Sequence, residues 1–306
     1  MSKLKNIKLI NYCGYRNFEL DLSDKEEGIR KWTMFYGPNG SFKSTFLKAV
    51  DLLSNPQRFF SKRNILTFRK LKHHKDYSYG VENFYDKMSE LKMEATFLVN
   101  GLEKKVVLED NISGIIYAAR DVDVEKGEFS GIRINELSPE DQGVIFIDAD
   151  HGNMMQKFQI ISDLSVPFCD FASSVYGFKC YCPDSSKVID SGIEYCTDFI
   201  IIKPDRDNKE YETKIHYKRM SDGEKKIATL VSSLFKRCYE GNPDNEKKSI
   251  VIVDNIELHI YFKRHMTLIK KIDEYFPNNQ FIVTTHSPVI ISEMDKNYLL
   301  DMEVNL

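Results

Sequence analysis

One stretch near the N-terminus constrains the fold more than any other, because it joins a strand to a helix through a glycine turn. It reads Phe35-Tyr36-Gly37-Pro38-Asn39-Gly40-Ser41-Phe42-Lys43-Ser44-Thr45. A strand, a glycine turn and a helix start that carries Lys and Ser or Thr are typical of a phosphate-binding loop. Unpaired N–H groups at the helix N-terminus favour an anion there. The sequence therefore predicts an α/β protein that binds phosphate at residues 37–45.

Two side chains of this loop have expected roles, and a third departs from the usual pattern. Lys43 supplies a positive charge for the β- and γ-phosphates of a nucleotide, and Ser44 offers a hydroxyl to Mg²⁺. Phe42 stands where the pattern has glycine. A side chain at this place is expected to weaken affinity or shift the nucleotide, without disabling the site.

The composition narrows the class of protein. The chain has 306 residues and 42% hydrophobic content, enough for one large domain or two small ones. A net charge of −3 gives no overall attraction to nucleic acid or membrane. The sequence contains no run of 18 apolar residues, and its start lacks the apolar core of a signal peptide. Six cysteines are ordinary for a reducing compartment. We expect a cytoplasmic protein.

Hydrophobic patterns predict further elements around the loop. Residues 6–22 predict two strands with Gly14 in the turn, and a helix should follow the loop and end near Asn55-Pro56. Asn100-Gly101 predicts a type I′ hairpin between residues 93–99 and 102–108. Residues 153–176 look partly helical, with a break at Pro167. The remaining expectations are strands at 115–119, 143–147, 199–202 and 211–217, with a turn at 205–209.

Two clusters each allow a functional and a structural interpretation. Residues 58–75 carry seven Lys or Arg and no acid, with phenylalanines interleaved. They form either a patch for nucleic acid or an acidic partner, or a solvated surface. Four cysteines gather at positions 169, 180, 182 and 196, but Cys180 and Cys182 lack the two-residue spacing of zinc sites. Buried reduced thiols are the expectation there.

Ser221-Asp222-Gly223-Glu224 begins a long helical pattern. Ser221 and Glu224 fit a capping box, which would be purely structural. That explanation does not account for Gly223, which is unfavourable in a first turn. A Ser-x-Gly-Glu helix start is also suited to bind phosphate.

Two apolar strands in the last third end in polar residues. The first, Ser249–Asp254, places Asp254 at the carboxyl end of a buried strand, where ligands bind and where it would hold Mg²⁺ through water. Asn255, Glu257 and His259 follow. The second strand runs from Gln280 to a Thr-His-Ser-Pro end, with His286 where a γ-phosphate sensor would lie.

These motifs, in this order, resemble an ABC-type ATPase head of the SMC/RecF/OLD-like branch of AAA-family ATP-binding proteins. The resemblance covers residues 5–55 and 215–295. It implies a P-loop NTPase fold, with an ABC-ATPase-like mixed sheet, flanking helices and an antiparallel N-terminal β subdomain. It implies one head over residues 1–306, with a nucleotide-binding core of 1–58 and 215–306 and an inserted lobe of 59–214.

The resemblance also implies a site for ATP and Mg²⁺. Its residues include Arg16-Asn17, the branch's N-terminal strand motif. The implied nucleotide contacts are Arg16, Asn17, Gly37, Pro38, Asn39, Gly40, Ser41, Phe42, Lys43, Ser44, Thr45, Ser221, Gly223 and Glu224. Ser44 and Asp254 would hold the metal, and Asp254, Asn255 and His286 would take part in catalysis. The family's Q-loop glutamine is either Gln142 or Gln156.

The mechanism implied by the family places ATP between two heads, against the phosphate loop of one and the Ser221–Glu224 segment of the other. The family's general base is the Glu that directly follows the strand Asp, but here that residue is Asn255. An amide positions water without accepting its proton. Glu257 would substitute only if the strand end were remodelled. Slow hydrolysis, or a dimer held by ATP, is therefore expected.

The sequence favours an ATP-binding, slowly hydrolysing head that dimerises on ATP and regulates a partner. The branch is rich in bacterial anti-phage and DNA repair proteins, in which such ATPases often work beside a nuclease or toxin. We expect that effector to be a separate chain. The alternatives are a non-hydrolysing, nucleotide-dependent scaffold, and a DNA-binding RecF-like repair ATPase. A membrane partner is not expected.

Overall fold

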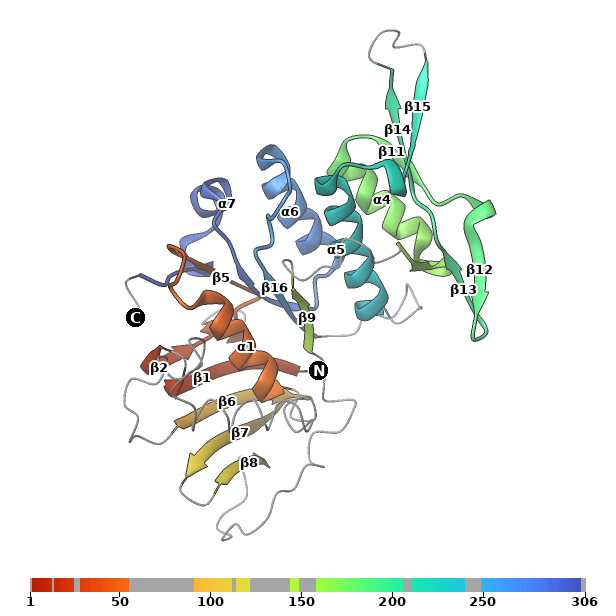
Figure 1. Ribbon diagram of the computed structural model, residues 1–306. Helices are drawn as coiled ribbons and strands as arrows, with labels where there is room; N and C mark the ends of the chain where they lie inside the picture. Colours follow the sequence, from red (N-terminus) through yellow and green to blue (C-terminus); the bar gives the residue numbers. More distant parts are fainter. Residues whose placement is uncertain are drawn as a thin grey trace, which may run out of the picture.

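The computed structural model describes residues 2–12, 14–24, 28–54, 91–111, 114–121, 144–148, 158–205, 211–239 and 249–303 (Figure 1). The basic segment 58–75, Gln142, Gln156 and nearly all of the turn expected at 205–209 lie outside these residues. No described helix is long and apolar enough to span a bilayer.

An antiparallel sheet forms the N-terminal layer. In pairing order its strands are β2 (Tyr15–Asp21), β1 (Ser2–Tyr12), β6 (Leu91–Val99), β7 (Leu102–Asn111) and β8 (Gly114–Asp121). Asn100 and Gly101 both have positive φ, 50° and 83°, and connect the paired residues Val99 and Leu102. The predicted type I′ hairpin is confirmed, because this turn needs positive φ at both central residues. The β1–β2 hairpin with Gly14 in its turn is confirmed as well.

A second sheet carries the predicted phosphate loop. Its strands, in order, are β18 (Leu299–Asp301), β5 (Trp32–Tyr36), β17 (Gln280–Thr284), β16 (Ile250–Asp254) and β9 (Val144–Asp148). Every pairing in this core sheet is parallel. The carboxyl ends of β5, β16 and β17 therefore meet at one edge, which is where ligands bind in open α/β sheets.

The core sheet is covered on both faces, because alternate residues of its central strands enter different hydrophobic clusters. Ile250, Ile252 and Ile282 pack with helix α1 (Lys43–Ser54) and the antiparallel sheet. Val251 and Val283 pack with the helices on the opposite face. Burying such a side chain contributes about 1.5–3 kcal/mol, so both faces stabilise the sheet. The result is a layered α/β fold with an antiparallel N-terminal subdomain, as the sequence predicted (Figure 1).

In the described part of the chain, three helices form the layer opposite α1. They are α4 (Ser165–Tyr176), α5 (Asp222–Tyr239) and α6 (His265–Tyr275), and the shorter α7 (Pro288–Glu293) follows β17 (Figure 1). Helix α5 buries the predicted apolar face, including Ile227, Leu230 and Leu234. The break expected at Pro167 is wrong, since α4 continues through that residue. Pro167 lies in the first turn of α4, where a missing N–H removes no helical hydrogen bond.

Short strands project beyond α4 (Figure 1). One small sheet has the order β10 (Ile160–Ile161), β13 (Ile193–Cys196) and β12 (Lys187–Asp190). Another has the order β11 (Lys179–Tyr181), β14 (Ile200–Pro204) and β15 (Glu212–His216). Elsewhere, β3 (Ser23–Asp24) and β4 (Gly28–Ile29) form a separate two-stranded sheet. The described part of segment 59–214 is thus distributed: β6–β8 join the antiparallel sheet and β9 joins the core sheet. The division into core and inserted lobe stays a prediction.

Candidate functional site

The predicted phosphate loop connects β5 to α1, and Lys43 is the first residue of the helix. Gly37 and Gly40 have φ of 141° and 84°, which glycine adopts without strain. The Lys43 ammonium donates hydrogen bonds to the carbonyl oxygens of Gly37 and Pro38, at 3.0 and 2.8 Å, and to Ser41 Oγ at 3.2 Å. A phosphate at this helix N-terminus would compete for those same N–H donors.

Phe42 is accommodated by the hairpin turn between β1 and β2. Its φ of 59° is left-handed, which explains why this position usually carries glycine. A Cβ added to Gly14 would lie 2.4 Å from the Phe42 ring, so the ring covers that glycine. The Tyr15 hydroxyl donates to the Phe42 carbonyl oxygen at 2.9 Å, and the two rings lie 6.1 Å apart. Phe42 therefore ties the loop to the β1–β2 turn.

This contact also determines where Arg16 and Asn17 lie. Both are exposed and follow Tyr15 directly on β2. The Tyr15–Phe42 hydrogen bond holds the start of β2 against the phosphate loop. The structure thus brings the predicted Arg-Asn motif to the side of the loop. Contact between these two residues and a nucleotide stays a prediction.

The carboxyl end of β16 is held by the neighbouring strand β17. Asp254 is buried, and its Oδ1 accepts a hydrogen bond from the Thr284 hydroxyl. Thr284 Oγ1 in turn accepts from the Asn255 N–H at 2.7 Å, and the Thr284 carbonyl accepts from the Ile256 N–H at 3.1 Å. Asn255 has φ of 48°, a left-handed conformation that asparagine tolerates better than most residues. The chain therefore turns sharply after Asp254 and crosses the end of β17.

That turn brings Glu257 to the end of β17. Its Oε1 accepts from the backbone N–H of His286 at 2.6 Å. Its Oε2 is buried without a hydrogen-bond partner among the described residues. Burial lowers the pKa of Lys43, and the carboxylates of Asp254 and Glu257 oppose that shift. Lys43, Asp254 and Glu257 therefore interact electrostatically at one site.

His286 and the residues after it are tied to both neighbouring segments. The His286 side chain is exposed, and the preceding Thr285 N–H donates to the Phe35 carbonyl at 3.0 Å. Ser287 caps α7 by accepting from the Ile290 N–H, and its Oγ lies 2.7 Å from Nδ1 of the buried His265. His265 Nε2 lies 2.8 Å from the Ile260 carbonyl. These bonds fix the segment after β16 against the start of α7.

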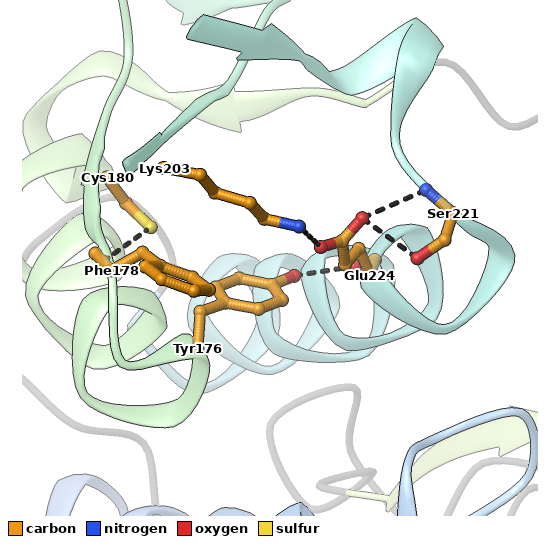
Figure 2. A network of polar contacts seen from close by, with 6 residues as sticks. All are labelled: Tyr176, Phe178, Cys180, Lys203, Ser221 and Glu224. Atoms are coloured by element: carbon orange, nitrogen blue, oxygen red, sulfur yellow. Dashed lines mark hydrogen bonds and ion pairs between the residues drawn. The ribbon is translucent and has the colours of Figure 1, made fainter. Parts of the chain in front are cut away.

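The Ser221–Glu224 motif forms a second group of polar residues, at the start of α5 (Figure 2). Glu224 Oε2 accepts from the Ser221 N–H at 3.0 Å and from its hydroxyl at 2.8 Å, and Lys203 of β14 pairs with Oε1. The Tyr176 hydroxyl donates to the Glu224 carbonyl at 2.6 Å. Burial alone would raise the pKa of Glu224, but the bonds from Lys203 and Ser221 outweigh it and hold that pKa below its usual range.

The packing of Gly223 explains the glycine that capping alone left unexplained. An added Cβ would lie 2.3 Å from the carbonyl oxygen of His259. His259 belongs to the segment that follows β16 and has φ of 64°. The glycine therefore permits close contact between the start of α5 and the segment that begins with Asn255.

The cysteines expected to be buried thiols are free. Cys169, Cys180 and Cys196 are buried, and Cys182 is half-buried. The sulfur atoms of Cys169 and Cys182 lie 3.7 Å apart. Burial raises the pKa of Cys180 to about 12, which disfavours a reactive thiolate. In the described parts of the chain, no three His, Cys, Asp or Glu side chains form a group suited to hold a metal ion.

Comparison with solved structures identifies the fold. An SMC head domain from Thermotoga maritima matches with a TM-score of 0.58 and 16% identity, over 98% of this chain and 94% of that one. An SMC head bound to the C-winged helix domain of ScpA matches with a TM-score of 0.62 and 13% identity, over 97% and 93%. The fold is that of an SMC-type ATPase head. The predicted resemblance to an ABC-type head of the SMC-like branch is therefore confirmed for the fold.

Sequence comparisons are consistent with this fold. Residues 190–292 match the family described as "AAA domain, putative AbiEii toxin, Type IV TA system". The Septu protein PtuA of Bacillus mycoides is 21% identical over 94% of this chain and 38% of its own length. The Retron Vc95 probable ATPase of Vibrio cholerae is 39% identical over 77 residues, which are 24% of this chain and 15% of that protein. The chain thus matches less than half of the length of each of these relatives.

Within the head, the predicted residues form two separate groups. The phosphate loop, Asp254, Asn255 and His286 gather at the carboxyl edge of the core sheet. Ser221 and Glu224 lie at the start of α5, which packs on the face opposite α1. Among the described residues, no hydrogen bond or ion pair joins Ser221 or Glu224 to residues 37–45.

Sequence reasoning missed the supporting roles of Gly14 and Lys203, and it admitted Glu257 only if the strand end were remodelled. Gly14 accommodates Phe42, Lys203 pairs with Glu224, and Glu257 reaches the strand end. For Gly14 a signal existed, since a glycine beside Tyr15 is suited to receive the bulky Phe42. The positions of Lys203 and Glu257 depend on tertiary contacts that no local pattern reports.

Proposed function

We propose that the chain is an ATP-binding head that dimerises on ATP, hydrolyses it slowly and thereby controls a partner effector. The observation that carries this proposal is the position of Lys43. It starts α1 beside the buried carboxylate of Asp254, at the carboxyl edge of a parallel sheet. Backbone donors, a cation and a carboxylate are the set that phosphoryl transfer to water requires.

The donor chemistry is suited to ATP with Mg²⁺. The Lys43 ammonium donates to two loop carbonyl oxygens and the Ser41 hydroxyl, and in this proposal it exchanges these partners for phosphate oxygens. The Ser44 hydroxyl and the Asp254 carboxylate are the oxygen ligands that would hold Mg²⁺. When bound, the metal neutralises part of the phosphate charge. In this proposal Arg16 and Asn17 border the nucleotide, and the exposed His286 senses its γ-phosphate.

A second copy of the head would supply Ser221, Gly223 and Glu224 to the nucleotide. The separation of the two polar groups within one head supports this arrangement. Ser221 is exposed and directly precedes α5, and the N-terminus of a helix favours an anion. Two heads facing each other would place each such terminus over the partner's phosphate loop.

The names of the relatives support a role in defence against phage. They include a Septu protein and probable ATPases of retrons. Such a role would give the head a regulatory task, in which ATP-driven dimerisation holds or releases a nuclease or toxin carried by another chain. A scaffold without turnover is the second candidate, and the amide at Asn255 favours it, because Asn accepts no proton from water.

Molecular mass with and without ATP tests the proposal. ATP should double the mass of the wild-type head in light scattering, and Ser221→Arg should block the dimer while ATP still binds to the monomer. Ser174→Arg is the matched control, because Ser174 is an exposed serine on α4 and its replacement should leave the dimer intact. An ATP-dependent dimer that survives Ser221→Arg would contradict the facing arrangement.

A further inference from the structure

A sharp turn at the end of β16 brings Glu257 to the end of β17, beside the proposed nucleotide site. Asn255 adopts φ of 48°, and two hydrogen bonds to Thr284 fix the turn. The chain then runs across the end of β17. As a result the Glu257 carboxylate accepts a hydrogen bond from the backbone N–H of His286, two residues beyond Thr284, the last residue of β17.

The two oxygens of this carboxylate have different environments. Oε1 is held by the His286 N–H at 2.6 Å, which fixes the orientation of the group. Oε2 is buried and has no hydrogen-bond partner among the described residues. A buried carboxylate oxygen without a partner is costly, and such atoms in folded proteins call for an explanation such as a catalytic role.

The surroundings of Glu257 match those of a group that handles water beside phosphate. Glu257 and Asp254 both act electrostatically on Lys43, the residue proposed to hold the β- and γ-phosphates. Asp254 is already bonded to Thr284, whereas Glu257 Oε2 remains available. Asn255, at the position where the resemblance implies the general base, has no carboxylate to offer.

We propose that Glu257 is the general base of this head and replaces the carboxylate missing at Asn255, an inference that rests on the ATPase function proposed above. Water attacks the γ-phosphorus and forms a new P–O bond. The bond from the γ-phosphorus to the β–γ bridging oxygen breaks, and ADP leaves with that electron pair. The proton of the attacking water passes to Glu257 Oε2 and then to phosphate or solvent. Asn255 orients the water through its amide.

Steady-state turnover of Glu257→Gln tests this role, with Lys43→Ala as the blank. Loss of a general base typically costs about 10²–10⁴-fold in rate, and that loss is expected here. Gln retains an oxygen that accepts the His286 N–H, so folding and ATP affinity should be unchanged. A second readout is the lifetime of the ATP-bound dimer, which Glu257→Gln should lengthen. Glu293→Gln, at an exposed carboxylate on α7, is the control and should match the wild type.

A pH profile separates a base from a structural carboxylate. The wild-type kcat should fall toward acid pH as the base becomes protonated, and the residual rate of Glu257→Gln should lack that decline. Glu257→Asp, which withdraws the carboxylate by one methylene, should keep the acid decline at a reduced rate.

The outcomes are distinguishable from failure of the proposed function. Wild-type turnover in Glu257→Gln overturns the assignment. ATP binding by the wild type with no turnover above the blank also overturns it, and leaves a nucleotide-dependent scaffold. If the wild type binds no more ATP than Lys43→Ala, the proposed function itself fails.

Discussion

Replacing Gly223 with alanine tests how the start of α5 packs. The variant becomes less stable if the new Cβ meets His259, and more stable if helix propensity alone decides. Gly223 lies in the first turn of α5, where helix propensity alone favours alanine by about 1 kcal/mol. The new Cβ, however, would lie 2.3 Å from the His259 carbonyl oxygen, closer than Cβ atoms are found to real neighbours. The contacted oxygen belongs to the backbone and the alanine methyl has no alternative rotamer, so no side-chain rotation relieves the overlap. Overpacking of this kind typically costs about 1–3 kcal/mol.

The two effects give a net loss of up to about 2 kcal/mol in the free energy of unfolding. Denaturant-induced unfolding measures this value directly. Because His259 follows Asn255 and Glu257 in the same segment, relief of the overlap should also displace that segment and reduce ATP turnover. A variant that gained about 1 kcal/mol would show that propensity alone governs Gly223, and would refute the close contact between α5 and His259.

Four further predictions concern residues in and around the two polar groups. Gly14→Ala should weaken ATP binding and lower stability, because the new Cβ meets the Phe42 ring and the φ of this residue is 97°. Adding Phe42→Gly should restore part of both losses. Purely additive effects in this double-mutant cycle would exclude the contact. Lys203→Met should cost about 1–2 kcal/mol in urea unfolding, less than a fully buried pair, because Glu224 keeps two bonds from Ser221. Because the folded pKa of Glu224 lies below its usual range, its contribution is present at neutral pH and is lost as pH falls through that pKa; Glu224→Gln should therefore flatten the acid limb of stability, and an unchanged limb would argue against the network. Asn255→Glu, added to Glu257→Gln, should restore part of the lost turnover. Its left-handed backbone at position 255 should lower the free energy of unfolding by about 1 kcal/mol. No recovery of turnover would show that position 255 does not reach the attacking water.

The elements that could be predicted from the sequence are those with local signals. The phosphate loop follows from glycines, Lys43 and a helix start at fixed spacing, and the Asn100-Gly101 hairpin follows from the φ values that its turn needs. The buried strand that ends at Asp254 follows from its continuous β-branched run. In each case the physical cause lies within a few residues of its effect.

The features that could not be predicted depend on contacts between distant segments. The turn at Asn255 requires Thr284, which is 29 residues away, and only that turn brings Glu257 to the strand end. Lys203 and Glu224 are 21 residues apart and lie on a strand and a helix. Pro167 was misjudged for the opposite reason, since its effect depends on its position within α4, and in the first turn a proline is tolerated.

ATP affinity of the wild type and of Lys43→Ala tests the central claim most directly, with Lys48→Ala as the control from the exposed side of the same helix. Loss of the charged hydrogen bonds from Lys43 to phosphate should cost about 3 kcal/mol or more, a weakening of about 150-fold. Equilibrium dialysis with ATP and Mg²⁺ should show this loss in Lys43→Ala alone. Equal affinity in the wild type and Lys43→Ala would contradict the assignment of residues 37–45 as the phosphate site.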